Sequence, residues 1–93
     1  MDVNEELVMQ EFDVATMLAT NTGKMLVCGL FNGSIQFWDV EKKDMSLEIP
    51  SHLAEITSLA ISIDQRILVS AGADYLINVW DAEKMCLLFE IRE

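Results

Sequence analysis

Three side chains in the second half of this sequence are of the types that hydrolases use: His52, Ser70 and Asp74. A histidine held by an aspartate can take the proton of a serine hydroxyl, which makes that serine a nucleophile. Ser70, however, stands within an apolar run and lacks the flanking glycines of a nucleophile elbow. His52 is the only histidine, and no glycine-rich phosphate loop or metal-ligand cluster accompanies it. We therefore expect no enzyme activity, no cofactor and no metal.

The two cysteines, Cys28 and Cys86, stand in separate apolar runs without close spacing or histidine neighbours. This arrangement predicts neither a zinc site nor a disulfide framework. A free cysteine behaves as a small hydrophobic residue. We therefore expect both to be buried free thiols.

The chain is acidic, with 16 acidic against six basic residues and a formal net charge of −10. Such a field repels nucleic-acid phosphates and anionic lipid head groups, so direct binding of nucleic acid or membrane is disfavoured. A basic protein partner fits the charge. The acids also keep a β-rich chain soluble and its edges apart, and this explanation is equally good.

The composition and the first residues indicate a folded, intracellular protein. The 93 residues are 52% apolar with one proline, which excludes disorder, and their apolar runs are far below the ~18 residues of a membrane span. Acids occupy the start of the chain, where a signal peptide would be positively charged. We therefore expect a cytoplasmic location.

The elements that must position these residues are organised by an internal repeat. The stretch from Asn32 to Asp39 returns as Asp74 to Asp81, with the two Trp-Asp pairs 42 residues apart. The same shift aligns Leu26-Val27 with Leu68-Val69 and further pairs on either side.

Short apolar runs with turn residues every 8 to 12 positions predict antiparallel strands rather than a β/α fold. The Asn32-Gly33 pair predicts a type I′ hairpin turn, in which both residues take a positive φ. The strands are expected at 14–20, 24–29, 34–40 and 45–49 in the first unit, and at 56–62, 66–71, 76–81 and 86–91 in the second.

A period of roughly 40 to 45 residues ending in Trp-Asp is similar to that of the WD repeat, four strands to a propeller blade. Nearly the whole chain resembles two such blades. The resemblance implies an all-β fold of two four-stranded antiparallel WD-repeat blades, an incomplete β-propeller. Residues 1–13 would be a lead-in segment, 14–49 the first blade and 50–93 the second.

In this family a blade is typically held by a hydrogen-bonded tetrad, and the second repeat has all four members: His52, Ser70, Asp74 and Trp80. Asp74 would accept a hydrogen bond from one ring nitrogen of His52. The other ring nitrogen would accept from the Ser70 hydroxyl, and the serine oxygen would accept from the Trp80 indole N–H. Each buried polar group would then have a partner. Ser51 precedes the histidine where the family usually has glycine.

The first repeat departs from this pattern. A shift of 42 places Gln10 at the histidine position, Cys28 at the serine position and Asn32 at the aspartate position, which leaves only Trp38. We expect Trp38 to have no intact polar network, and the first blade to unfold locally more easily than the second.

The resemblance also implies a partner-binding face, where the loop before the first strand and the turn after the second emerge. An exposed aromatic beside acids would be an interface anchor, although Phe31 could equally pack on the neighbouring turn. The corresponding positions are Asp13, Ala15 and Phe31 in the first repeat and Glu55, Thr57 and Ala73 in the second.

The function that follows is a non-catalytic protein-interaction scaffold. The alternative is a structural piece that completes a larger propeller or a homo-oligomeric ring with further WD-repeat blades; an enzyme is the weakest reading. Propellers have about 4 to 8 blades, so two leave bare flanks, and the chain should be a piece of a longer protein or assemble with copies or partners. Ile35 and Phe37 of one unit and Ile77 and Val79 of the other are expected to cover each other at the single junction.

Overall fold

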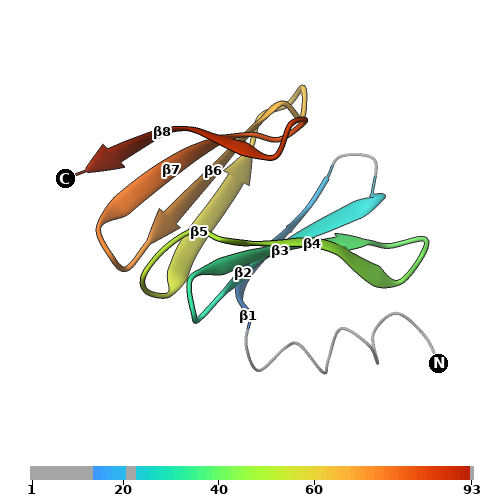
Figure 1. Cartoon of the computed structure of the whole chain (residues 1–93). Helices are drawn as coiled ribbons and strands as arrows, with labels where there is room; N and C mark the ends of the chain where they lie inside the picture. The colour runs from blue at the N-terminus through green and yellow to red at the C-terminus, as the bar shows by residue number, and fades with distance from the viewer. Residues whose placement is uncertain (1–13, 21–22, 93) are drawn as a thin grey trace.

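In the described part of the chain, eight strands form two sheets, each a run of consecutive antiparallel hairpins (Figure 1). The structure, a computed structural model, describes residues 14–20 and 23–92, so the lead-in segment lies outside the described residues. The predicted all-β architecture is confirmed, and each strand begins and ends within one residue of its expected bounds. The first sheet contains β1 (Val14–Ala19), β2 (Met25–Leu30), β3 (Ser34–Asp39) and β4 (Asp44–Pro50); the second contains β5 (Ile56–Ile61), β6 (Ile67–Gly72), β7 (Leu76–Asp81) and β8 (Cys86–Arg92).

Each of the six hairpin turns ends in a residue with a positive φ. Only two of these residues are glycines, Gly23 and Gly33; the others are Lys43, Gln65, Tyr75 and Met85. In such a loop a right-handed turn is followed by one residue in the left-handed conformation, and this residue directs the chain into the next strand with the twist of the sheet. The turns therefore fix where each strand starts.

The type I′ prediction for Asn32-Gly33 is wrong. Gly33 has a φ of 92°, but Asn32 is not among the residues with positive φ. The Gly33 N–H donates to the Leu30 carbonyl at 3.1 Å, and Asn32 Oδ1 accepts from the Ser34 N–H at 3.0 Å. The asparagine side chain thus holds a right-handed turn followed by one left-handed glycine, the three-residue form of the hairpin loop.

Irregularities in strand pairing recur at equivalent places in the two sheets. The β1–β2 register shifts between Val14 and Thr16, and the β5–β6 register shifts 42 residues later, between Ile56 and Ser58. Such bulges re-aim the extra residue and bend the strand. The bulged residues are Ala15 and Thr57, two of the predicted partner-face positions.

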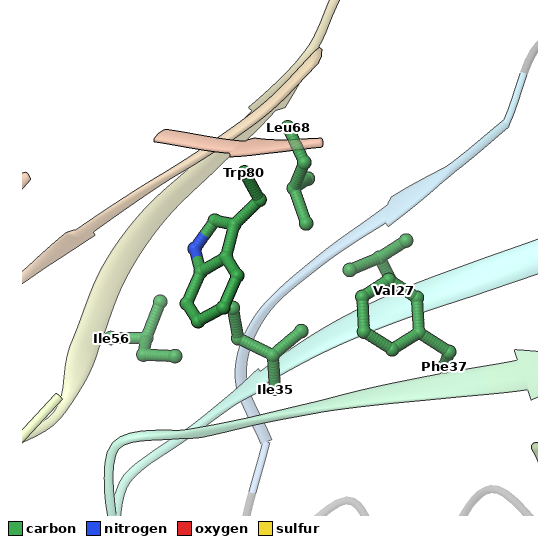
Figure 2. Close-up of a cluster of buried hydrophobic side chains, with 6 residues drawn as sticks. All are labelled: Val27, Ile35, Phe37, Ile56, Leu68 and Trp80. Atoms are coloured by element: carbon green, nitrogen blue, oxygen red, sulfur yellow. The ribbon is translucent and has the colours of Figure 1, made fainter. Parts of the chain in front are cut away.

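The core lies at the junction between the sheets. Val27, Ile35 and Phe37 from the first sheet pack with Ile56, Leu68 and Trp80 from the second. Figure 2 shows the Trp80 ring lying between Ile56 and Ile35.

The two sheets also approach each other through their backbones. Strand β5 lies against β1 and β2. A Cβ on Gly29 would come within 2.6 Å of Ile56 Cγ2, so the absence of a side chain at Gly29 lets Ile56 lie against the backbone of β2.

The expected pairing of faces at this junction is wrong. Ile35 and Phe37 do face the second sheet, but they meet Trp80 and its neighbours, not Ile77 and Val79. Successive side chains of a strand point to opposite faces, so Ile77 and Val79 lie on the face of β7 that Trp80 does not occupy. The sheets therefore stack in one direction, with unlike faces in contact.

The two cysteines differ in exposure, which corrects the expectation that both are buried. Cys28 is buried in the middle of the first sheet, and burial raises the pKa of its thiol to about 11. Cys86 is exposed because it belongs to β8, an edge strand whose residues all face solvent. Both are free.

We expect a thiol reagent such as iodoacetamide to modify Cys86 and leave Cys28 intact in the folded protein at neutral pH. The thiolate is the reactive form, and a buried thiol with a raised pKa supplies almost none of it. Mass spectrometry after brief labelling checks this, with Cys86→Ser as the matched control that should take up no label until denaturant is added. Equal labelling of both cysteines in the native protein would contradict it.

Candidate functional site

Four side chains of the second sheet and the loop before it form a continuous hydrogen-bonded chain. His52 Nδ1 lies 3.0 Å from Asp74 Oδ1 and 3.1 Å from Asp74 Oδ2, and His52 Nε2 lies 2.9 Å from Ser70 Oγ. The Trp80 indole N–H donates to Ser70 Oγ at 3.1 Å. The structure therefore brings together all four residues of the predicted tetrad.

The chemistry of the partners assigns the protons. The ionised Asp74 carboxylate only accepts hydrogen bonds, so the proton between the two side chains belongs to His52 Nδ1; with the neutral imidazole, Nε2 accepts from the Ser70 hydroxyl. The Ser70 oxygen then accepts from the Trp80 indole. Each donor in the tetrad has one acceptor.

The same Asp-His-Ser order of hydrogen bonds is found in catalytic triads. Burial distinguishes a structural tetrad from a catalytic triad here. Ser70 is 0% exposed, and its oxygen already receives the Trp80 N–H. A nucleophile needs an open approach for the carbonyl carbon that it attacks. The geometry is therefore suited to holding β6 and β7 to the loop before β5, not to acyl transfer.

Asp74 connects the tetrad to the backbone. Its carboxylate accepts from the Leu53 N–H at 3.0 Å and from the Leu76 N–H at 3.2 Å, besides the histidine. Burial alone would raise the pKa of the Asp74 carboxyl, but hydrogen bonds from the Leu53 N–H, the His52 ring and the Leu76 N–H lower it below the ordinary value of 3.8. The folded state therefore favours the ionised carboxylate.

Gly72 makes room for this pair. A Cβ at Gly72 would collide with His52 Nδ1 and with Asp74 Oδ1. The equivalent position of the first sheet is Leu30, which is buried. A leucine there would overlap an imidazole placed as in His52, so the first sheet cannot build the same tetrad around Cys28 and Asn32. Gln10 lies outside the described residues.

The first sheet has a different polar network, which sequence reasoning missed. The Trp38 indole N–H donates to Gln36 Oε1 at 3.0 Å, and Gln36 Nε2 donates to Glu48 Oε1 at 3.0 Å. The expectation that Trp38 has no network is therefore wrong. Gln36, which lies on β3 as Trp38 does, accepts the indole hydrogen bond that a serine on β2 would otherwise accept. The sequence signal for this network was a glutamine inside an apolar strand, two residues before the tryptophan. In the structure this glutamine pairs with Glu48 on the neighbouring strand.

Ser51 and Asn78 extend the polar cluster beside the tetrad. The Ser51 and Ser70 Oγ atoms are 3.3 Å apart, and Asn78 Nδ2 donates to the Ser51 carbonyl at 2.8 Å. Asn78 occupies the position of Gln36 in the repeat. A polar residue inside the apolar strand β7 was the sequence signal for this contact.

Hydrogen bonds also tie together three connections at one end of the sheets: β2–β3, β4–β5 and β6–β7 (lower left in Figure 1). The Gly33 carbonyl accepts from the N–H groups of Ser51 and His52, at 3.1 and 2.9 Å. The Ala73 N–H donates to the Glu55 carbonyl at 2.8 Å. We call this surface the loop face.

The structure places the predicted partner-face residues as follows. Phe31 and Ala73 are exposed in two of the tied connections, and Glu55 is half-buried in the third. Thr57 is exposed at its bulge, and its hydroxyl donates to the Ala71 carbonyl at 3.2 Å. Ala15 is half-buried at the equivalent bulge, and Asp13 lies outside the described residues.

Sequence reasoning missed two large side chains of the loop face. Leu53 is 94% exposed and Tyr75 is 75% exposed. Each directly follows a tetrad residue, His52 or Asp74, so position next to the tetrad was the signal that could have found them.

Metal binding and membrane spanning gain no support from the described part of the chain. Within residues 14–20 and 23–92, no group of three or more histidine, cysteine or acidic side chains is placed to hold a metal ion. The same residues contain no helix with the length and apolar character needed to cross a membrane.

Comparison with known proteins points to one family. Residues 44–81 match the family model described as WD domain, G-beta repeat. The chain is 29% identical over 85 residues to NACHT and WD repeat domain-containing protein 2 from Mus musculus, covering 91% of this chain and 5% of that protein. It is 30% identical over 78 residues to the Set1 complex component swd1 from Schizosaccharomyces pombe, covering 83% of this chain and 20% of that protein.

The fold likeness is close in three dimensions. The crystal structure of the Cps50 (Swd1) beta-propeller domain from Myceliophteria thermophila superposes with a TM-score of 0.83 at 26% identity, covering 87% of this chain and 25% of that one. The chain thus spans a fifth or less of these two curated relatives and a quarter of the solved propeller domain.

We expect Asp74→Asn to lower the free energy of unfolding by about 1.5 to 3 kcal/mol at neutral pH, the range for hydrogen bonds to a charged group. Because the folded-state pKa of Asp74 is depressed, its contribution is complete above the ordinary value of 3.8 and is lost as the pH falls through the folded value. Urea unfolding at a series of pH values should show the difference between the two proteins shrinking on acidification.

The lowered pKa of Asp64, which accepts from the Ser62 hydroxyl, is present in both proteins and cancels in that subtraction. A difference that stays constant down to about pH 2 would contradict the prediction, because an ionised Asp74 would then carry no special weight.

We also expect Trp80→Ala to destabilise the fold more than Trp38→Ala. Trp80 is buried at the junction between the sheets, where loss of a large aromatic costs roughly 3 to 5 kcal/mol. Trp38 is only half-buried, on the other face of its sheet, although both indoles donate one hydrogen bond. Equal shifts in denaturation midpoint would show that junction packing does not dominate.

Proposed function

This chain belongs to the WD-repeat family, and from that premise we propose that it is a non-catalytic scaffold that binds another protein through the loop face. WD repeats typically act in this way, and the swd1 relative is by its name a component of a complex. The net charge of −10 leads us to expect a basic protein as the partner, rather than nucleic acid or an anionic membrane.

The observation that carries the proposal is the preorganisation of the loop face. Three connections that are distant in sequence are joined by backbone hydrogen bonds at Gly33 and Glu55, and the tetrad anchors the middle one. A surface that is already ordered loses little conformational entropy on binding. Exposed Phe31, Thr57 and Ala73 project from it.

Burial supports the non-catalytic part of the proposal. Ser70, whose Oγ lies 2.9 Å from His52 Nε2, is fully buried and its oxygen is occupied by the Trp80 indole N–H. The His52 ring, the Ser70 hydroxyl and the Asp74 carboxylate are all engaged in holding the fold.

A second function is favoured by the outward face of the second sheet. Ile77 and Val79 lie there, and their partners across the ladder, Ile91 and Phe89, are about half exposed. The equivalent face of the first sheet, with Ile35 and Phe37, is covered by the second sheet. The chain would then be a structural piece that completes a propeller with further blades, from its own or another chain.

To test the scaffold proposal, a photo-crosslinking amino acid is placed at Phe31, at Thr57 or, as a control, at Lys42 in the turn at the opposite end. We expect the first two variants to crosslink to the same protein and the Lys42 variant to give no such product. Crosslinking of one protein from all three positions alike would contradict the loop face as the site. A fluorophosphonate adduct on Ser70 would contradict the non-catalytic role.

Sedimentation of the chain tests the second function. We expect an assembly larger than a monomer, which Phe89→Glu disperses because a charge on the outward face opposes its burial. The control is Leu53→Ser, which replaces an exposed side chain on the loop face and not on the outward face of the second sheet. It should leave the assembly intact. A stable monomer with a sharp cooperative melt would overturn this second function.

A further inference from the structure

The loop face carries three large exposed apolar side chains, one on each of its tied connections. Phe31 stands on β2–β3, Leu53 on β4–β5 and Tyr75 on β6–β7, with exposed fractions of 52%, 94% and 75%. The backbone under them is continuous, because Gly33 accepts from His52 and the Leu53 N–H donates to Asp74. Exposed apolar groups carried on loops that hydrogen bonds hold together are typical of a binding surface.

Tyr75 is held there against its own backbone preference. It has a φ of 68°, a left-handed conformation that bulky residues rarely take, and the repeat places Gly33 at the same position of the first sheet. Glycine would occupy this turn without strain. A tyrosine whose ring is mostly in solvent gains little packing in return, so its presence fits a contact made outside the chain.

The unpaired charge near these side chains is acidic. Glu55 follows Leu53 on the same connection, and its carboxylate has no hydrogen-bond or ion-pair partner within the described residues. The only basic residue at this end of the described sheets, Arg92, lies 3.2 Å from Glu90. The other described lysines and arginines stand in the turns at the opposite end: Lys24, Lys42, Lys43, Arg66 and Lys84.

We propose that the loop face binds a peptide segment that presents a large apolar side chain next to lysine or arginine. The apolar side chain packs among Phe31, Leu53 and Tyr75, and the cation pairs with Glu55. This proposal rests on the scaffold function and gives it a partner chemistry. An unpaired acid beside exposed apolar groups selects cationic segments over acidic ones.

The test uses two short synthetic peptides, one of lysine, leucine and serine and one in which glutamate replaces each lysine. Binding is measured by fluorescence anisotropy with the whole chain. The lysine peptide should bind and the glutamate peptide should not. We expect the Kd of the lysine peptide to rise by about tenfold, the change expected for one lost anchor, in each of three variants: Leu53→Ser, Tyr75→Gly and Glu55→Gln.

Matched controls come from the opposite end of the sheets. Ile63→Ser replaces a side chain that is 92% exposed, as Leu53 is, and Glu41→Gln removes an exposed acid. Both should leave the Kd unchanged within about twofold. Tyr75→Gly should keep or raise the melting temperature, since glycine relieves the positive φ, so its loss of binding cannot come from unfolding.

Three results would overturn the proposal: no binding of the lysine peptide, equal binding of both peptides, or equal weakening by the control substitutions. Its failure differs from failure of the scaffold function. If crosslinks still form from Phe31 and Thr57 while the lysine peptide does not bind, the loop face is the site and the proposed partner chemistry is wrong. If no crosslinks form there either, the scaffold function falls as well.

Discussion

The carboxylate of Asp74 is the acceptor on which the order of the second sheet and its loops depends. It receives the His52 ring N–H and the backbone N–H groups of Leu53 and Leu76 within 3.2 Å. One half-buried anion therefore fixes the loop before β5, the turn before β7 and, through His52, the hydroxyl of Ser70. Burial of these groups is favourable only because each finds a partner, which makes the set cooperative. The same bonds that stabilise the blade hold Leu53 in its exposed position.

The two sheets meet one structural requirement with different residues. Each buries polar groups on the face that carries its tryptophan, and each gives the indole N–H an acceptor. In the second sheet the acceptor is Ser70 on the neighbouring strand; in the first it is Gln36 on the same strand, backed by Glu48. The first network spans β3 and β4 only, whereas the second reaches a loop before its sheet. The loop face is accordingly organised around the second sheet.

The junction stacks unlike faces, and this has consequences for the faces left open. The Ile35 face of the first sheet is covered by the Trp80 face of the second. The two faces left open are the Ile77 face of the second sheet and the Trp38 face of the first. By the repeat, the Ile77 face is equivalent to the Ile35 face and the Trp38 face to the Trp80 face, the two faces that meet at the junction. Head-to-tail contacts of this kind continue until a ring closes. An interaction surface at the loop face and a closing contact at the flanks lie on different parts of the blades, so the two proposed functions are compatible.

The sequence by itself determined the repeat of 42 residues and the eight strands, because turn chemistry and alternation are local properties of the chain. The identities of the tetrad followed from the resemblance of this repeat to the WD repeat. The same resemblance implied that the loops near Phe31 and Ala73 would lie at one end. Tertiary structure decided what depends on register and on packing between sheets: which face of β7 meets Ile35, and whether a glutamine can replace Ser70 as the partner of a tryptophan. It decided the exposure of Cys86, since an apolar run becomes an edge strand only once the strand order is set. The prominence of Leu53 and Tyr75 likewise follows from hydrogen bonds between loops far apart in the chain, which no local pattern contains.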